Sequence, residues 1–299
     1  MLQLQLLLLT LIVIGYMSRK LKLIDEHQQK GLSSLLLNIF LPANIIHSFV
    51  SIDVSFSETA YSIILCILIS SIIQLAAIFS GPVFFSKFPE SRSHVMDYGL
   101  IVSNSSFIGI PVIEYLYGPI STMYSSVFQI PIRLTMWTAG LSLFTEKASF
   151  KEQFIRTMKH PCVIAVFTGL LMMALHIELP SFIDEGVSYL SRCTTPVSML
   201  VIGSILFDVP LNSLFDKAAF YFSLIRLIVF PGIVILVLSF FKIDPMIRNM
   251  TILMSAMPSG ATGAILAQQY RYDSQFAVRI MFVSTVISMI TLPFLFAFL

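Results

Sequence analysis

Charged side chains are scarce in this sequence: only 11% of its 299 residues are Asp, Glu, Lys or Arg, whereas 57% are apolar. A soluble domain carries about 25% charged residues, so the composition excludes an ordinary soluble fold. Long apolar stretches such as Tyr61–Phe85 and Phe220–Phe241 hold few or no charges. Each exceeds the ~20 residues that a helix needs to cross ~30 Å of hydrocarbon. Neither has the polar stripe of a soluble amphipathic helix, so we predict transmembrane helices.

Cysteine and clustered basic residues are also scarce. The three cysteines, Cys66, Cys162 and Cys193, lie in apolar blocks and form no C-x-x-C pair. They are therefore interpreted as small buried hydrophobic side chains, and we expect neither a disulfide framework nor a metal or other cofactor. The net charge is +2, and the one short basic cluster, Arg19–Lys22, borders an apolar block. Such a cluster is typical of a topology signal, so no nucleic-acid partner is expected.

Ten apolar blocks separated by polar breaks predict ten transmembrane helices. They are Leu2–Met17, Leu32–Val50, Thr59–Phe85, Tyr98–Tyr117, Thr122–Phe144, Pro161–Leu179, Val187–Phe207, Ala219–Phe241, Asn249–Tyr270 and Phe276–Leu299. The first block carries no charged side chain, and cations follow it. A secretory signal has its positive charges before the apolar stretch, so we expect a retained first helix whose N-terminus lies outside the cell.

Lysine and arginine gather in the loops that follow the odd-numbered predicted helices. The loop between helices 1 and 2 and the loop between helices 5 and 6 hold Arg19, Lys20, Lys22, Lys30, Lys147, Lys151, Arg156 and Lys159. The opposite loops are nearly bare of cations, and the loop between helices 6 and 7 is acidic, with Glu178, Asp184 and Glu185. The positive-inside rule then places the basic loops in the cytoplasm and both termini outside a bacterial-type cell membrane.

The most polar stretch, Thr145–His160, divides the ten predicted helices into two groups of five. We therefore expect a first five-helix repeat over residues 1–145, a cytoplasmic linker over residues 146–160 and a second repeat over residues 161–299. An odd number of spans in each half makes the second half enter the membrane upside down relative to the first. That arrangement is the inverted repeat found in many transporters.

Prolines recur at matching places in the two halves. Pro42 and Pro196 lie in the second helix of each half, and Pro111 and Pro258 lie in the fourth. Around the latter pair, the runs Ser103–Pro111 and Ser255–Gly263 combine proline with glycine and small hydroxyl residues.

Proline inside a helix removes a backbone donor, and a membrane tolerates the break only where other groups or a polar cavity satisfy the freed backbone. Close packing of small residues around a kink is the alternative interpretation. The matching interruptions favour a transporter's binding site, where helix N-termini attract an anion.

In their order and spacing, several motifs resemble the auxin efflux carrier family, within the bile/arsenite/riboflavin transporter superfamily. The matching stretches are Gly15-Tyr16, Leu37–Pro42, Asn104–Pro111, Tyr117-Gly118, Met257-Pro258 and Thr291–Pro293. The resemblance covers the whole chain and implies ten helices in two inverted repeats, with broken helices 4 and 9 crossing at their prolines. It also implies that helices 1, 2, 6 and 7 form a scaffold and the other six a mobile transport domain.

The resemblance further implies a binding site at the crossover. The candidate substrate-binding residues are Asn104, Ser105, Pro111, Pro258 and Ser259, together with Asn38 and Thr195 in helices 2 and 7. Bacterial members of the family include malate and malonate permeases, so the expected function is secondary active transport of a small organic anion by alternating access. Auxin is not supported as the cargo, because the large hydrophilic loop of the plant carriers is absent. The acidic residue that those carriers have in helix 3 also has no counterpart, since only Gln74 is strongly polar there.

Charged residues within predicted spans are candidates for function by default. Arg133 and Arg226 lie deep in helices 5 and 8, and we interpret them as substrate counter-ions or members of internal ion pairs, with snorkelling to the surface as the alternative. Glu114 lies just past the break in helix 4. It is either the carrier of a coupling proton or an ordinary carboxylate at the outer end of the helix.

Two other function classes fit the sequence less well. An intramembrane enzyme is disfavoured because the five histidines fall mostly in loops or at helix ends and form no catalytic pattern. A channel is disfavoured because two proline breaks in an inverted repeat fit alternating access better. The expected partners are a small organic anion and the lipid bilayer, with H+ or Na+ as coupling ion. Cargo identity, transport direction and the choice between monomer and homodimer are left open.

Overall fold

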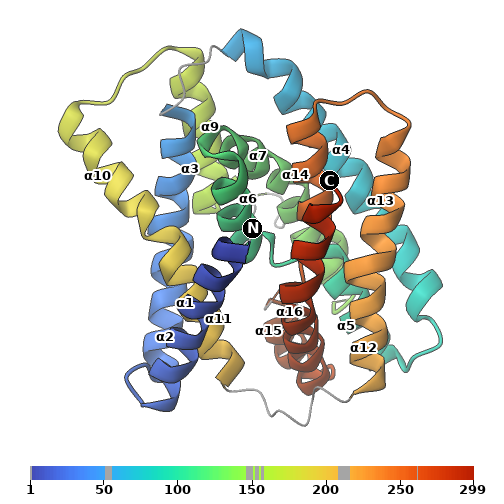
Figure 1. Ribbon diagram of the computed structural model, residues 1–299. Helices are drawn as coiled ribbons and strands as arrows, with labels where there is room; N and C mark the ends of the chain where they lie inside the picture. Colours follow the sequence, from blue (N-terminus) through green and yellow to red (C-terminus); the bar gives the residue numbers. More distant parts are fainter. Residues whose placement is uncertain are drawn as a thin grey trace. The chain divides into compact units, whose positions relative to one another are not determined.

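The computed structural model describes residues 2–50, 56–145, 151, 155, 158–207, 216–260 and 262–299. Within these ranges the regular elements are helices, and the one β-type pairing is an isolated antiparallel bridge between Ser103 and Ser259. The predicted all-helical class is therefore confirmed (Figure 1). Most of the predicted linker over residues 146–160 lies outside the described residues.

The helices follow one another along the chain, and the segments labelled η are π-helical. The first are α1 (Leu2–Lys20), α2 (Glu26–Leu35), η1 (Leu36–Phe40), α3 (Leu41–Val50), α4 (Phe56–Phe85), α5 (Glu90–Ile101), η2 (Ser105–Gly109), α6 (Ile110–Tyr117), α7 (Pro119–Thr135) and η3 (Met136–Gly140). They are followed by α9 (Pro161–Ala174), α10 (Ser181–Arg192), α11 (Thr194–Phe207), α12 (Lys217–Leu224), η5 (Ile225–Val229), α13 (Phe230–Ser239), α14 (Pro245–Ser255), α15 (Thr262–Gln269) and α16 (Ser274–Ala297).

Five helical stretches among the described residues are long and apolar enough to cross a membrane. They are Glu26–Val50, Thr59–Phe85, Ser181–Phe207, Lys217–Ser239 and Ser274–Ala297. These stretches coincide with the second, third, seventh, eighth and tenth predicted spans. Helix α4 also exposes a stripe of large apolar side chains at helical spacing, which includes Leu68, Ile72, Leu75, Phe79 and Val83. An exposed apolar face of this kind suits contact with lipid.

The fourth and ninth predicted spans are not single helices. Helix α5 ends at Ile101, and an extended residue, Val102, follows it. Helix α14 ends at Ser255, whereas α15 begins only at Thr262. The sixth predicted span forms the shorter helix α9. Ten spans in two inverted repeats, with helices 4 and 9 crossing, therefore stay a prediction.

Several helices begin earlier than predicted, among them α2, α5 and α10. Helix α10 starts directly after Pro180, so Asp184 and Glu185, which we expected in a loop, lie within its first turns. Helix α10 is amphipathic, with polar and apolar side chains on different faces. Spans predicted from unbroken apolar blocks therefore leave out its polar first turns.

Aspartate residues begin several helices. The side chains of Asp216, Asp244 and Asp273 accept hydrogen bonds from backbone N–H groups in the first turns of α12, α14 and α16. Asp25 begins α2 in the same way, and Gln28 bonds back to the Asp25 backbone to complete a capping box. A cap of this type satisfies donors that the helix itself leaves unpaired.

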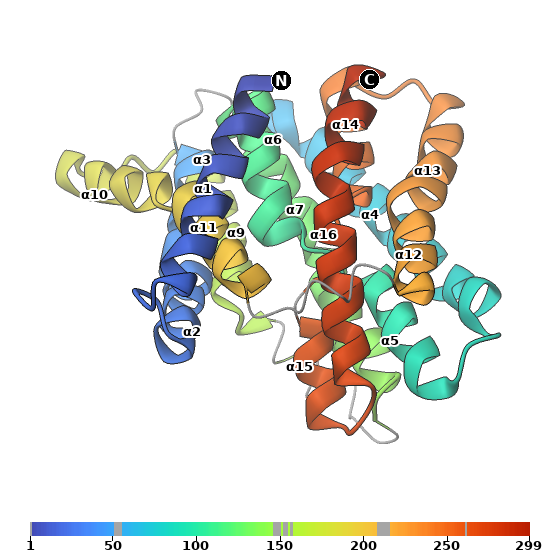
Figure 2. The same ribbon diagram turned by 60° about the horizontal axis from the view of Figure 1, so that its bottom comes forward.

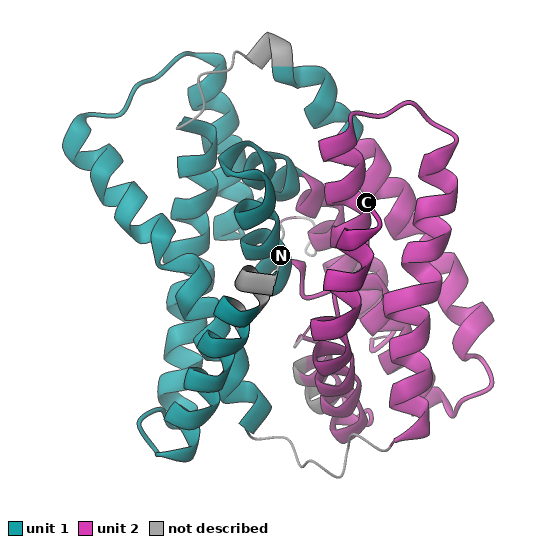
Figure 3. Cartoon of the chain, in the orientation of Figure 1, with its two compact units in different colours: residues 1–65, 106–127, 158–208 teal, residues 66–105, 128–157, 209–299 magenta. Residues whose placement is uncertain are grey.

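The described helices divide into two compact units, which draw residues from both halves of the sequence (Figure 3). Unit 1 comprises Met1–Leu65, Ser106–Val127 and Met158–Asp208, and unit 2 comprises Cys66–Ser105, Phe128–Thr157 and Val209–Leu299. In unit 1, α1 packs along α11, and α3 packs against α9 and α10. A Cβ atom at Gly203 would overlap the carbonyl oxygen of Ile12, so the approach of α11 to α1 requires glycine at this position.

In unit 2, α16 packs against α5, α12 and α15, and α13 packs against α14. Both ribbon views show α12 and α13 following one another along one course beside α16 (Figures 1 and 2). The described part of unit 2 therefore places the end of α5 and the end of α14 in the same packed body as α12, α15 and α16.

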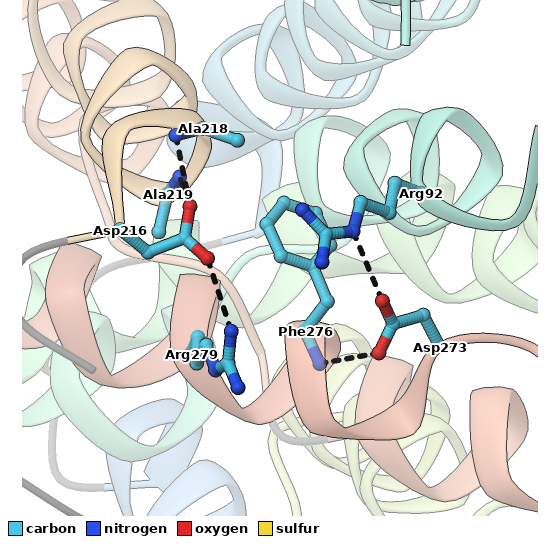
Figure 4. Close-up of polar contacts among 7 residues, drawn as sticks. All are labelled: Arg92, Asp216, Ala218, Ala219, Asp273, Phe276 and Arg279. Carbon is cyan, nitrogen blue, oxygen red and sulfur yellow. Dashed lines mark hydrogen bonds and ion pairs between the residues drawn. The ribbon is translucent and has the colours of Figure 1, made fainter. Parts of the chain in front are cut away.

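Two ion pairs join helix ends in unit 2 (Figure 4). Arg92 of α5 lies 3.0 Å from Asp273, and Arg279 of α16 lies 3.1 Å from Asp216. The guanidinium of Arg92 also lies over the ring of Phe276, 4.7 Å from its centroid. All four charged side chains are partly exposed, so each pair contributes at most about 1 kcal/mol. The two pairs serve chiefly to fix the starts of α12 and α16.

Candidate functional site

The candidate site lies where two helices of unit 2 are interrupted. Backbone atoms of residues 102–104, after α5, leave the helical path, and so do those of residues 256–260, after α14. Pro258 explains the second break, because it has no N–H group and disfavours the helical conformation of the residue before it. The first break has no proline within it, since Pro111 stands later, in the first turn of α6.

The two interrupted segments pair with each other. The N–H group of Asn104 donates to the carbonyl of Pro258 over 2.7 Å, and the N–H group of Gly260 donates to the carbonyl of Val102 over 3.1 Å. Together with the bridge between Ser103 and Ser259, they form a short antiparallel ladder. The ladder satisfies backbone groups that would otherwise be costly inside a membrane.

This pairing corrects one expectation from the sequence. From the sequence, we expect helix N-termini at the interruptions to attract an anion, which requires N–H groups there that are not already hydrogen-bonded. Those of Asn104 and Gly260 bond to the opposite segment, and the N–H group of Ser259 bonds to the hydroxyl of Ser284 over 3.2 Å. A ligand at the described part of this break would therefore meet side chains and helix ends rather than these three donors.

Arg226 binds both breaks at once. Its Nε atom donates to the carbonyl of Met257 over 3.0 Å, and its Nη1 atom donates to the carbonyl of Leu100 over 3.2 Å. Leu100 lies in the last turn of α5, and Met257 follows the end of α14. A cation is favourable at these helix C-termini, where unpaired carbonyls carry partial negative charge. Arg226 is almost fully buried, and we interpret it as a positioning residue that holds the two breaks together.

Polar side chains surround the ladder. Asn104 is half-buried, and no partner for its amide occurs among the described residues. Ser105 and Ser259 are buried. On the preceding helix, the hydroxyl of Tyr98 donates to Thr262 Oγ1 over 3.0 Å, which links α5 to the start of α15. Four predicted site residues thus gather here, namely Asn104, Ser105, Pro258 and Ser259, with Arg226 bound to the same segments.

The remaining predicted residues lie elsewhere. Arg133 is buried near the end of α7, in unit 2. Pro111, Asn38, Thr195 and Glu114 belong to unit 1. Their role in binding stays a prediction.

Asn38 and Thr195 belong to unit 1, Asn38 within the π-helical segment η1 and Thr195 near the start of α11. Asn38 is exposed, lies in the π-helical segment η1 and bonds to Ser34 one turn earlier. Thr195 is half-buried. Its neighbour Thr194, which sequence reasoning did not select, donates to the carbonyl of Phe40 over 3.0 Å and so ties α11 to the end of η1.

Glu114 belongs to a polar cluster of unit 1 that the sequence did not reveal. Its two carboxylate oxygens lie 3.1 Å and 3.0 Å from Asn44 Nδ2, which is also 3.0 Å from the hydroxyl of Ser191. The three side chains come from α6, α3 and α10. An amide within the apolar run that follows Pro42 was the available signal, but its partners are distant in sequence and could not be paired by pattern alone.

The sequence is similar to known membrane transport proteins. A family model described as membrane transport protein matches the chain twice, over residues 2–154 and over residues 147–296. An uncharacterized transporter of Methanocaldococcus jannaschii is 24% identical over 309 residues, covering 96% of this chain and 95% of the relative. The uncharacterized transporter YfdV of Escherichia coli is 21% identical over 298 residues, covering 96% of this chain and 93% of the relative. An uncharacterized transporter of Methanothermobacter thermautotrophicus is 25% identical over 299 residues, covering 95% and 94%.

Proposed function

Because the chain belongs to the membrane transport protein family, also called the auxin efflux carrier family, we propose that it is a secondary active transporter of a small organic anion. The cargo is a mono- or dicarboxylate such as malate or malonate. It binds at the interrupted helices of unit 2 and crosses the membrane by alternating access.

The paired interruptions beside Arg226 carry this proposal. Irregular backbone at membrane depth is tolerated where it is buried in protein or lines a cavity, and in transporters it coordinates cargo and ions. Here the ladder and the two Arg226 hydrogen bonds satisfy the backbone without using the side chain of Asn104. The amide of Asn104 is therefore available as a two-proton donor to a carboxylate.

The sign of the cargo follows from Arg226. Its hydrogen bonds are made to carbonyl oxygens, which are neutral, and the structure describes no carboxylate in an ion pair with it. A buried cation of this kind creates a positive potential around the break. That potential favours an anion over a neutral or cationic ligand.

The double match of the family model supports two repeats, and five predicted spans in each half support their inverted orientation. In this arrangement both termini are extracytoplasmic. Coupling to H+ or Na+ supplies the energy, because inward movement of an anion opposes a negative-inside potential by ~2.3 kcal/mol per charge per 100 mV.

Uptake of radiolabelled mono- and dicarboxylates into proteoliposomes tests the proposal. Saturable uptake is expected for at least one of them. The Asn104→Ala variant should raise the KM about tenfold or more, since a hydrogen bond to a charged ligand contributes roughly 1.5–3 kcal/mol. Asn249→Ala is the matched control, because Asn249 is also half-buried in unit 2 but lies in the first turns of α14.

Two outcomes would contradict the proposal. An ohmic, non-saturating current would identify a channel instead. Equal KM values for wild type, Asn104→Ala and Asn249→Ala would place the binding site elsewhere.

A further inference from the structure

Asp97 is a buried carboxylate that lies outside every predicted span. It lies on α5, directly before the predicted start of the fourth span at Tyr98, and its side chain is only 6% exposed. Its Oδ1 atom is fully buried and has no hydrogen-bond partner among the described residues. An acceptor in this state is rare in folded proteins and calls for a specific explanation.

The unpartnered oxygen faces the backbone of α4. A Cβ atom at Gly81 would lie 2.5 Å from Asp97 Oδ1, so glycine at this position is what admits the carboxylate against α4. The same oxygen is thus enclosed by helix packing and left without a donor, which makes it unsuited to a permanent negative charge.

The surroundings of Asp97 suit a proton rather than a metal cation. Hard metal cations take about six or more oxygen ligands. Among the described residues, no group of three or more His, Cys, Asp or Glu side chains could hold a metal ion. The side-chain contact of the Asp97 carboxylate is a hydrogen bond with Ser93, on the preceding turn of α5. A proton needs no such cage, because it binds one carboxylate oxygen covalently and removes the charge.

The charged groups around Asp97 are few and mostly paired. His94, on the same helix, is the titratable group among the described residues whose charge acts on Asp97. Among elements packed against α5, α16 brings Asp273 and Arg279, which are paired with Arg92 and Asp216. The sequences of η3 and α15, and of α4 between Thr59 and Phe85, contain no charged residue.

We propose that Asp97 is the proton-binding residue of the transport cycle: it takes up a proton in one state of unit 2 and releases it in another. This inference rests on the proposed function, and it selects H+ over Na+ as the coupling ion. Gly81 lies in the last turns of α4, on the side that the basic loops predict to be cytoplasmic. Release of the proton there would leave a carboxylate that must be reprotonated or rehydrated before the next cycle.

Proteoliposomes loaded with a pH-sensitive dye test this inference, with malate and malonate as probes. In wild type, a pH gradient should drive accumulation of the probe together with acidification of the lumen. In Asp97→Asn, exchange at equal pH should persist without its pH dependence, while gradient-driven accumulation falls at least tenfold and acidification stops. Asp216→Asn is the matched control and should remain coupled, because it removes a carboxylate of the same length that is already paired with Arg279.

The outcomes separate the inference from the function on which it rests. Wild-type exchange without proton movement would overturn the role of Asp97 and leave transport standing, whereas no exchange of any carboxylate would overturn the proposed function. Proton movement by Asp97→Asn at the wild-type rate would also overturn the inference. If Asp97→Asn does not fold, Asp97→Ser, which is smaller and likewise cannot titrate, is measured in the same way.

Discussion

Glu114 in unit 1 lies within the predicted fourth span and Asp97 in unit 2 lies one residue before it, and the surroundings of the two carboxylates differ. The oxygens of Glu114 face the amide of Asn44, which lies within 3.1 Å of both. Asp97 has one oxygen enclosed beside Gly81 without a partner. Hydrogen bonds of this kind stabilise the ionised form of a carboxylate, whereas burial without a partner destabilises it. Burial alone therefore does not identify a titrating group.

The same contrast extends to the two units. In unit 1 the buried polar groups are joined across helices, as in the Asn44 cluster and the bond from Thr194 to Phe40. In unit 2 they gather at interrupted helices, where Arg226 holds carbonyl oxygens and the amide of Asn104 is unpartnered among the described residues. We therefore expect substitutions in the unit 1 clusters to reduce stability, and substitutions at the unit 2 breaks to reduce transport.

The largest effect is expected from Arg226→Gln. The glutamine amide is shorter than arginine and lacks the guanidinium fork whose Nε and Nη1 atoms reach the two carbonyls. We therefore expect at least one buried carbonyl to lose its partner, at a cost of about 1–3 kcal/mol. With the loss of the positive charge, transport should fall about 100-fold in protein that still inserts. Uptake normalised to folded protein, measured by size-exclusion chromatography, checks this.

Arg226→Lys sharpens the same test. Lysine keeps the charge but lacks the rigid fork that reaches two carbonyls at once. If both substitutions abolish transport equally, the fork matters more than the charge. Wild-type rates in both variants would remove Arg226 from the mechanism.

A smaller effect, on stability, is expected from Asn44→Leu in unit 1. The substitution removes the donor that Glu114 and Ser191 share, and should lower the free energy of unfolding by about 1–3 kcal/mol. Transport per folded molecule should stay within about twofold of wild type. Thermal unfolding and uptake are the measurements. A shifted pH profile of uptake with unchanged stability would instead assign proton coupling to the Glu114 cluster.

The smallest effect concerns Asp216, a fully paired carboxylate of unit 2. Burial acts to raise the pKa of Asp216, but hydrogen bonds from Ala219, Arg279 and Ala218, with the charge of Arg92, outweigh it and hold that pKa below its ordinary value. A lowered folded-state pKa means that the stabilisation is present above about pH 4 and is lost as the pH falls through the folded-state value.

Asp216→Asn keeps a residue that caps helices well but removes this charge. Wild type should therefore exceed the variant in stability by less than about 1 kcal/mol near neutral pH, and the difference should vanish at low pH. Thermal unfolding against pH is the measurement. A difference that grows on acidification would show that the sign of the pKa shift is wrong.

The apolar blocks predicted most of the long helices, because lipid imposes length and composition on each span. Proline and small polar residues likewise predicted the interruptions that contain Asn104 and Pro258. Two features escaped prediction. The partners of Arg226 and Asn44 are distant in sequence, and hydrogen bonding at that range depends on packing that no local pattern encodes. Asp97 is not among the predicted residues, because it stands one position before an apolar block and so falls in a predicted loop.

The π-helical segments were also missed, although they contain Asn38, Ser105 and Arg226. A π-turn differs from an α-turn by one residue in its hydrogen-bonding and has no distinct hydrophobic period. The polarity of these residues therefore predicted that they matter, but the sequence did not predict the π-helical backbone around them.

The ladder between the two interrupted segments has a consequence for how such carriers diversify. Its hydrogen bonds join main-chain atoms of Val102, Asn104, Pro258 and Gly260. Side chains at Ser103, Asn104 and Ser259 can therefore be exchanged without breaking the hydrogen bonds of the ladder. A few substitutions would then suffice to change which cargo binds at the interrupted helices, while the backbone that positions the site stays the same.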